Sequence, residues 1–186
     1  MGDITIKQVE IDHLLEDASY LQDEAEALTY VIEEVPYDEK TPDGESIRGY
    51  LTEIRDAGSE YYRPVIEKTY REHRPVNLSD FAYQNDGSKN EAQKDQKEII
   101  KLIRGIGKKR ASLISLVRRF TLSDWQKLLR EEGGREITLF WFFRSMVTRE
   151  RAILKKIADL VLIYQNERAQ QREIEKKSAS RKAIME

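Results

Sequence analysis

The longest uninterrupted helical pattern in the sequence runs from Thr138 to Gln165, a stretch that contains no Gly and no Pro. Its apolar residues recur every three or four positions, which places them along one side of an α-helix. They are Leu139, Phe142, Phe143, Met146, Ile153, Leu154, Ile157, Leu160, Val161 and Tyr164. A helix with so wide an apolar side needs tertiary packing to be stable in water, so other helices of the chain must cover it.

Three further segments carry the same periodicity. The first runs from about residue 10 to 34, the second begins at Glu45 or Ser46, and the third runs from about residue 91 to 120. Pro64 removes a backbone donor and crowds the preceding turn, so we expect a break near Tyr62 and Arg63, followed by a short helical piece to about Glu72. Residues 73–90 are polar and rich in turn formers, which predicts a long loop.

A shorter element precedes the last helix. Ser123 is a candidate N-cap, and Gly133 and Gly134 are residues that typically end a helix, so we expect a short helix between them. Thr138 is then a possible N-cap for the final helix. The sequence therefore predicts an all-α four-helix bundle with a short extra helix before the last helix.

Composition agrees with a single helical domain. The chain has 186 residues, of which 35% are charged and 39% hydrophobic, with only 9 Gly and 4 Pro. We expect residues 1–165 to form one bundle domain. Past Gln165 the apolar stripe is lost while the sequence stays helix-friendly, so we expect residues 166–186 to form a charged helical or frayed tail.

Charge is distributed unevenly along the chain. Residues 1–90 hold 9 Lys and Arg against 21 Asp and Glu, whereas residues 91–186 hold 23 against 13. The favoured interpretation is that acidic and basic helices lie side by side in one bundle. Nucleic-acid binding is not favoured, because the basic residues alternate with Glu and lack interleaved exposed aromatics.

Several function classes have no support in the residues. The absence of Cys removes disulfides, thiolate metal sites and a Cys nucleophile. No apolar run approaches the roughly 18 residues of a membrane span, and the N-terminus lacks the apolar core of a secretion signal, so a cytoplasmic protein without a membrane role is expected. No hydrolase or zinc-protease motif is present.

Two segments carry a resemblance to a known family. The segment SIRGYLTEIRDAGSEYY, with Ser46, Ile47, Ile54, Asp56 and Ala57, is similar to the metal-ligand helix of the DinB-like (DinB/YfiT-type) superfamily. A second segment resembles that family's third and last helices and the step between them. Its matching residues are Asp124, Trp125, Gly134, Thr138 and Leu139. The resemblance spans about residues 10–165 and implies an up-down-down-up bundle. That fold is shared by metal-dependent enzymes that use low-molecular-weight thiols such as bacillithiol or mycothiol, and by DNA-damage-inducible proteins.

The sequence departs from this family at its metal site. The resemblance implies three His ligands, one on the second helix and two at i, i+4 on the last helix. The corresponding residues here are Glu53, Arg149 and Ile153. An Arg repels a dication and Ile has no lone pair, while His13 and His73 have no partner at ligand spacing. We therefore expect no metal and no cofactor; a site built from carboxylates alone is not favoured.

These substitutions suggest that an ion pair takes the place of the metal ion. We hypothesise that Glu53 and Arg149 face each other across the former metal site and form an ion pair that links the second and last helices. The alternative is that both point to solvent, beside neighbours such as Arg55 and Glu150.

The resulting functional hypothesis is a DinB-like bundle that has lost its metal triad and acts as a non-catalytic small-ligand-binding, structural or stress-related protein. Glu53, Arg149 and Ile153 are its candidate ligand-binding residues, for a small anionic or apolar ligand, and a homodimer is possible through a helix face. The alternative is a thiol-dependent S-transferase that works without a metal or with an atypical one, using Glu53 as general base.

Overall fold

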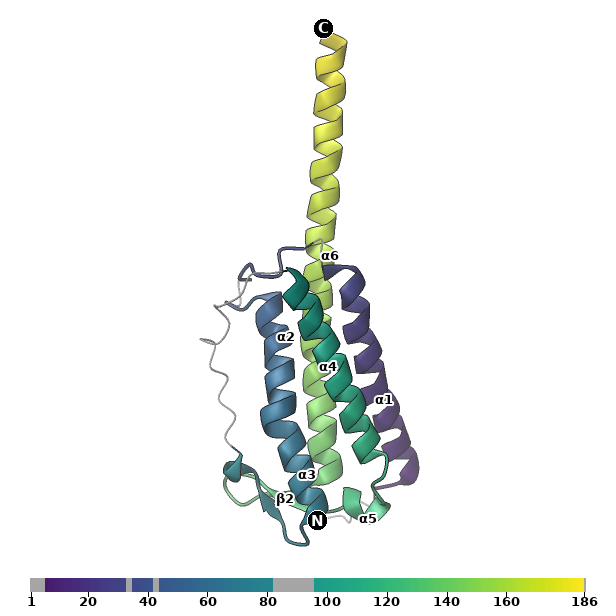
Figure 1. The fold of residues 1–186 in the computed structure, drawn as a ribbon, viewed down its shortest axis with the longest axis vertical. Helices are drawn as coiled ribbons and strands as arrows, with labels where there is room; N and C mark the ends of the chain where they lie inside the picture. Colours follow the sequence, from purple (N-terminus) through teal and green to yellow (C-terminus); the bar gives the residue numbers. More distant parts are fainter. Residues whose placement is uncertain (1–5, 33–34, 42–43, 82–95, 186) are drawn as a thin grey trace.

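Four long helices form the body of the molecule. The computed structural model describes residues 6–32, 35–41, 44–81 and 96–185. The bundle helices are α1 (Gln8–Ala27), α2 (Ile47–Asp56) with its continuation, α4 (Gln96–Val117) and α6 (Leu139–Met185). In Figure 1, α1 and α6 run upward while α2 and α4 run downward. The predicted four-helix bundle with up-down-down-up topology is confirmed.

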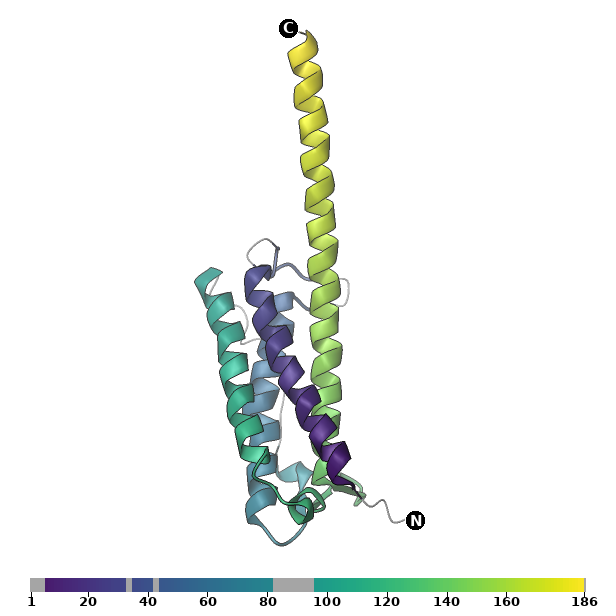
Figure 2. The same ribbon diagram turned by 90° about the vertical axis from the view of Figure 1, so that its right-hand side faces the viewer.

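The packing follows the apolar stripes of the sequence. α1 and α2 each pack against α4 and α6, and the two views in Figures 1 and 2 show the four helices side by side. The largest fully buried side chains include Phe143, Met146, Leu51, Ile99 and Ile103. Acidic α1 thus lies against the more basic α4 and α6, and Arg151 of α6 pairs with Asp17 of α1 at 2.8 Å. The expectation that acidic and basic helices lie side by side is correct.

The first helix is shorter than its pattern predicts. α1 ends at Ala27 and passes into one 3₁₀ turn, η1 (Leu28–Tyr30), although apolar residues continue to Ile32. Leu28 and Ile32 are buried, so the apolar pattern reports burial there rather than α-helical geometry. Residues 33–34 lie outside the described residues.

The second helix does not break at Pro64. Ser46 caps α2 by accepting a hydrogen bond from the Gly49 N–H at 3.0 Å. α2 then continues through a π-helical segment, η3 (Ala57–Tyr62), into α3 (Arg63–Arg71). The expected break is replaced by a widened turn, and Pro64 lies in the first turn of α3, where a missing N–H is tolerated.

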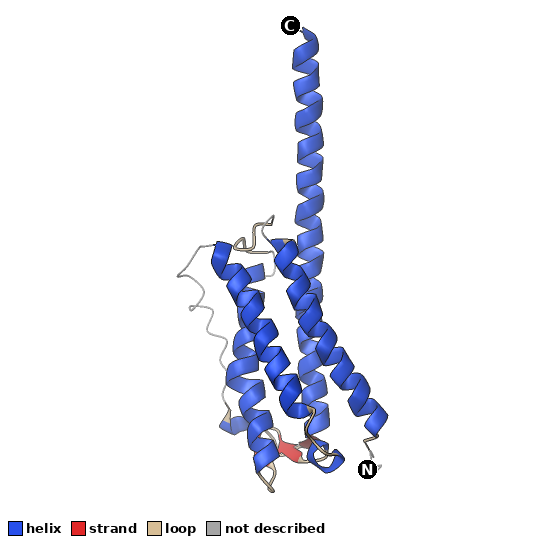
Figure 3. Ribbon diagram, turned by 45° about the vertical axis from the view of Figure 1, so that its right-hand side comes forward, coloured by secondary structure: helices blue, strands red, loops and turns tan. Residues whose placement is uncertain are grey.

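A small sheet closes one end of the bundle, which the all-α prediction did not include. The strands β1 (Val76–Asn77), β2 (Leu128–Arg130) and β3 (Glu136–Thr138) form a sheet in which β2 pairs parallel to β1 and antiparallel to β3 (Figure 3). Gly133 and Gly134 have positive φ values of 91° and 85°. These glycines therefore form the turn between two strands and do not end a helix.

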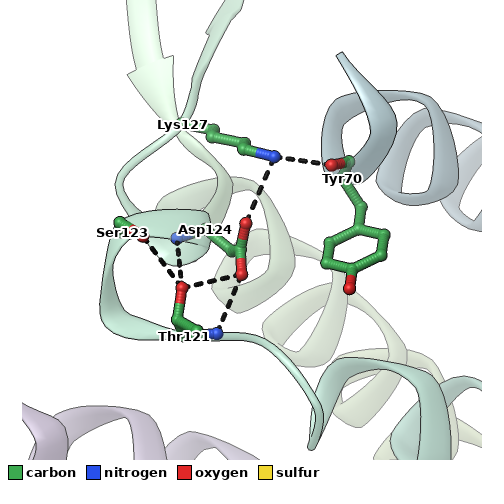
Figure 4. A network of polar contacts seen from close by, with 5 residues as sticks. All are labelled: Tyr70, Thr121, Ser123, Asp124 and Lys127. Carbon is green, nitrogen blue, oxygen red and sulfur yellow. Dashed lines mark hydrogen bonds and ion pairs between the residues drawn. The ribbon is translucent and has the colours of Figure 1, made fainter. Parts of the chain in front are cut away.

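The element before this sheet is a single turn, α5 (Leu122–Trp125), and its N-cap is Thr121 rather than the predicted Ser123. The Thr121 hydroxyl accepts from the Asp124 N–H, and the Asp124 carboxylate accepts from the Thr121 N–H at 2.9 Å. Lys127 binds the same carboxylate at 3.2 Å and donates to the Tyr70 carbonyl at the end of α3 (Figure 4). This network fixes α5 to α3, and it holds Trp125, which is 1% exposed, against Phe143 of α6.

The predicted loop after α3 is partly structured. β1 is followed by one 3₁₀ turn, η4 (Leu78–Asp80), and the Phe81 ring accepts a cation–π contact from Lys68 at 5.2 Å. Phe81 therefore anchors the chain to α3. Tyr83 and the predicted start of the third helix at residues 91–95 lie outside the described residues.

The last helix extends far beyond the other three. α6 is 47 residues long, and Figures 1 and 2 show its C-terminal part projecting from the bundle. Its first turn is supported by Thr138, whose hydroxyl accepts from the Trp141 N–H at 3.4 Å. None of the helices in the described part of the chain is long and apolar enough to cross a membrane.

Candidate functional site: an ion pair between α2 and α6

The centre of the candidate site is formed by α2 and α6, which lie side by side. Glu53 lies on α2, six residues after the first helical residue, and its side chain is 16% exposed. Arg149 lies on α6, and its side chain is 44% exposed. The Arg149 Nη2 donates to Glu53 Oε1 at 2.5 Å. The predicted ion pair between the second and last helices is therefore present.

Tyr62 completes the surroundings of this pair. Its hydroxyl accepts a hydrogen bond from Arg149 Nη1 at 3.4 Å, and its ring is 5.2 Å from that of Tyr61 and 5.6 Å from that of Phe142. Partial burial acts to lower the pKa of Arg149, but the Tyr62 hydroxyl and the Glu53 carboxylate outweigh burial, so the pKa is raised. Arg149 is thus held in its charged form. The π-helical segment presents Tyr62 to α6, and π turns are frequent at functional sites.

Ile153 belongs to the core. It lies one turn after Arg149 and is 9% exposed, and its hydrocarbon side chain is part of the same apolar cluster as Leu154 and Ile157. The structure therefore brings Glu53 and Arg149 into contact and turns the third predicted residue into a packing residue. Among the aromatic residues of α2 and α6, Tyr50 and Phe142 are buried, while Trp141 is 40% exposed.

A second ion pair uses the next residue of α6, and it was not predicted from the sequence. Arg110 of α4 pairs with Glu150 of α6 in the bundle interior, where the two residues are 6% and 3% exposed. Arg110 Nη1 also contacts the Met146 sulfur at 3.6 Å. Burial lowers the pKa of Arg110 to about 10, and nearby Tyr62 opposes this effect. Arg110 therefore stays charged at neutral pH.

The sequence did contain a signal for this pair. Glu150 falls between Met146 and Ile153 on the apolar stripe of α6, and Arg110 falls between Ile106 and Leu113 on that of α4. A single charge in the middle of an apolar stripe, matched by an opposite charge on a partner stripe, indicates a buried pair. Glu150 was named from the sequence only as a solvent neighbour in the alternative to the Glu53–Arg149 pair, whereas the structure buries it.

The residues at this site do not fit a metal ion. A dication needs lone pairs from His, carboxylate or thiolate groups, whereas the site offers one carboxylate, one cation and one hydrocarbon. The carboxylate already accepts from a guanidinium. Throughout the described ranges there is also no group of three or more His, Cys, Asp or Glu that could hold a metal. His13 contacts Glu16 at 3.5 Å and His73 is exposed, and neither belongs to the site.

The up-down-down-up topology of the four helices (Figure 1) is that of the DinB-like fold expected from the sequence. A solved structure supports this assignment: YfiT from Bacillus subtilis, described as a probable metal-dependent hydrolase with an unusual four-helix bundle topology. The two structures superpose with a TM-score of 0.70 over 86% of this chain and 90% of YfiT, at 13% sequence identity. Comparison with protein-family models and with curated proteins gave no match. The resemblance expected from the sequence is thus confirmed at the level of the fold.

Proposed function

We propose that this chain is a non-catalytic DinB-type bundle protein, in which the Glu53–Arg149 ion pair replaces a metal ion as the link between α2 and α6. The observation that carries the proposal is the 2.5 Å contact between these groups at the positions that the resemblance assigns to metal ligands. YfiT is described as a probable metal-dependent hydrolase, whereas the donor set here cannot hold the ion on which such chemistry depends.

The Glu53–Arg149 contact supports a cross-link between α2 and α6 more directly than it supports a ligand-binding site. An anion that binds Arg149 has to compete with Glu53 or use the remaining guanidinium N–H groups on the exposed side of Arg149. Ligand binding at Glu53, Arg149 and Ile153 stays a prediction. A homodimer, a cytoplasmic location and a role in stress are likewise predictions.

Metal analysis tests the central claim. We expect protein purified without a His tag to contain no stoichiometric dication, because an Arg and an Ile stand where ligands are required. One equivalent of zinc, nickel or manganese that survives dialysis would overturn the proposal.

The rival function, an S-transferase with Glu53 as base, has its own test. The Glu53 carboxylate is already engaged by the Arg149 guanidinium, so we expect no turnover with low-molecular-weight thiols and electrophiles. Turnover that disappears in Glu53→Gln and persists in the surface variant Glu60→Gln would favour the enzyme.

A further inference from the structure

A cavity of about 130 Å³ lies on another face of α2, between α2–η3 and α4. It is close in size to a cavity of roughly 150 Å³ that holds benzene in an engineered protein. The Glu53–Arg149 pair faces α6, whereas this cavity faces α4, so the two sites use different sides of the same helix.

Part of the cavity lining is apolar, and the π-helical segment contributes two small residues to it. Ile54, Ile106 and Leu113 line it with buried hydrocarbon. Gly58 and Ser59, both in η3, also line the cavity, and a Cβ placed on Gly58 would have no atom within 4 Å. A larger side chain at position 58 therefore has room beside the cavity.

The charged residues that line this cavity are all cations. They are Arg55, Arg63, Lys109 and Arg110. Lys109 Nζ donates to the Ser59 hydroxyl at 2.6 Å, and Arg63 Nη1 donates to the Ser112 hydroxyl at 3.1 Å. These two cross-helix bonds connect α4 to η3 and α3 at the cavity.

Carboxylates lie near these cations without lining the cavity. Asp56 pairs with Arg55 at 2.6 Å, Glu67 with Arg63 at 2.8 Å, and Glu150 with Arg110. Lys109 differs from the others, because its hydrogen bond goes to a neutral hydroxyl. Lys109 and Arg63 thus bring positive charge to a cavity whose lining also contains apolar side chains.

We propose that this cavity binds a small organic anion with a compact apolar body, about the size of benzoate. The body fills the space between Ile54, Ile106 and Leu113, and the carboxylate accepts hydrogen bonds from Lys109 and Arg63. An anionic head gains charge-assisted hydrogen bonds that a neutral amide cannot make. Ligand binding in this cavity does not require the Glu53–Arg149 pair.

Titration of the full-length protein tests the ligand class. Benzoate, its neutral analogue benzamide and inorganic phosphate are added separately and followed by amide chemical shifts or calorimetry at low salt. We expect saturable one-to-one binding of benzoate, with benzamide weaker by at least about fivefold because it lacks the charge. Phosphate should also bind more weakly, because it lacks the apolar body. No saturation by about 10 mM benzoate, or tighter binding of benzamide or phosphate, would overturn the proposal.

Two substitutions with matched controls test the location. Gly58→Leu fills the cavity and should abolish benzoate binding, whereas Gly105→Leu, at an open glycine outside the cavity lining, should not. Lys109→Met should weaken binding roughly threefold to tenfold, and Lys101→Met, on the same helix, should leave it unchanged.

Folding is checked by far-UV circular dichroism and thermal melting. If Gly58→Leu does not fold, the Lys109 and Lys101 variants still decide the question. Equal affinity in these two lysine variants, or in the two leucine variants, would contradict the proposal. Glu53→Gln should bind benzoate as the wild type does, so loss of the ion pair and loss of the cavity ligand are distinguishable.

Discussion

Arg149 and Glu150 are consecutive residues of α6 with opposite charges, and they have opposite surroundings. Arg149 is 44% exposed and pairs with Glu53 of α2, whereas Glu150 is 3% exposed and pairs with Arg110 of α4. Successive residues on a helix lie about 100° apart, so one helix can direct them to two different partners. The exposed pair can rearrange with water, but the buried pair has no such alternative.

The buried pair also contains an oxygen atom that lacks a hydrogen-bond partner. Glu150 Oε1 is the one buried side-chain polar atom without a hydrogen-bond partner among the described residues. An unpaired buried acceptor costs free energy, and a buried ion pair seldom repays the desolvation of its charges. The position of a charged residue on α6 therefore sets how much its ion pair contributes to stability, because position decides its access to water.

The largest predicted effect comes from separating the buried charges. Glu150→Leu leaves the Arg110 charge uncompensated in the core, so we expect a loss of about 3–5 kcal/mol in the free energy of unfolding. The double variant Arg110→Met/Glu150→Leu should recover most of this loss, because it removes both charges. Urea denaturation measures each variant, and a single-variant loss no larger than that of Glu53→Gln would erase the distinction between the two pairs.

Removal of the Asp124 carboxylate from the capping box of α5 should have the next largest effect on the free energy of unfolding. Burial acts to raise the pKa of Asp124, but the hydrogen bonds from Thr121 and the contact with Lys127 outweigh burial, so the pKa lies below its usual value. We expect Asp124→Asn to cost about 1 kcal/mol at neutral pH, a magnitude typical of cap removal.

This contribution should depend on pH with a definite sign. Because the folded pKa of Asp124 is lowered, the charged carboxylate stabilises the protein above the unfolded pKa, and that stability is lost as pH falls through the folded value. The difference between wild type and Asp124→Asn should therefore shrink below about pH 4. Melting temperatures between pH 2 and 7 measure it, and a difference that grows on acidification would contradict the assignment.

The exposed pair should give a smaller effect. We expect a double-mutant cycle of Glu53→Gln and Arg149→Met to show a coupling of about 0.5–1 kcal/mol, because solvent screens a partly exposed pair. Raising the salt concentration to 1 M should reduce this coupling. The pair Arg151–Asp17, in which both side chains are 47% exposed, serves as a fully superficial control. A coupling equal to or below that of the control would show that Glu53 and Arg149 do not link the helices.

The smallest expected effect is that of added metal. Zinc stabilises a protein only if it binds the folded state better than the unfolded state, and the site offers a single carboxylate that is already paired. We expect the melting temperature to be the same with equimolar zinc or with EDTA. A rise with zinc that disappears in Glu53→Gln would place a metal at this position.

Sequence alone determined the helices and the exposed pair. The 3.6-residue periodicity of apolar residues specifies amphipathic helices locally, and the absence of His at Glu53, Arg149 and Ile153 is read directly from the sequence. The pairing of Glu53 with Arg149 was predicted from the family resemblance, which indicates which faces of α2 and α6 meet. The limits of α1 and the cap at Thr121 were predicted less well, because short-range patterns leave helix ends uncertain.

Tertiary structure decided the rest. Strands of two or three residues, as in β1 and β2, have no periodicity of their own and form only when distant segments meet at the bundle end. The continuation of α2 through η3 past Pro64 depends on packing that fixes Tyr62 between α2 and α6. The cavity beside Gly58 and the burial of Glu150 are properties of how helices pack, because the space and the access to water around a side chain are set by residues far away in sequence.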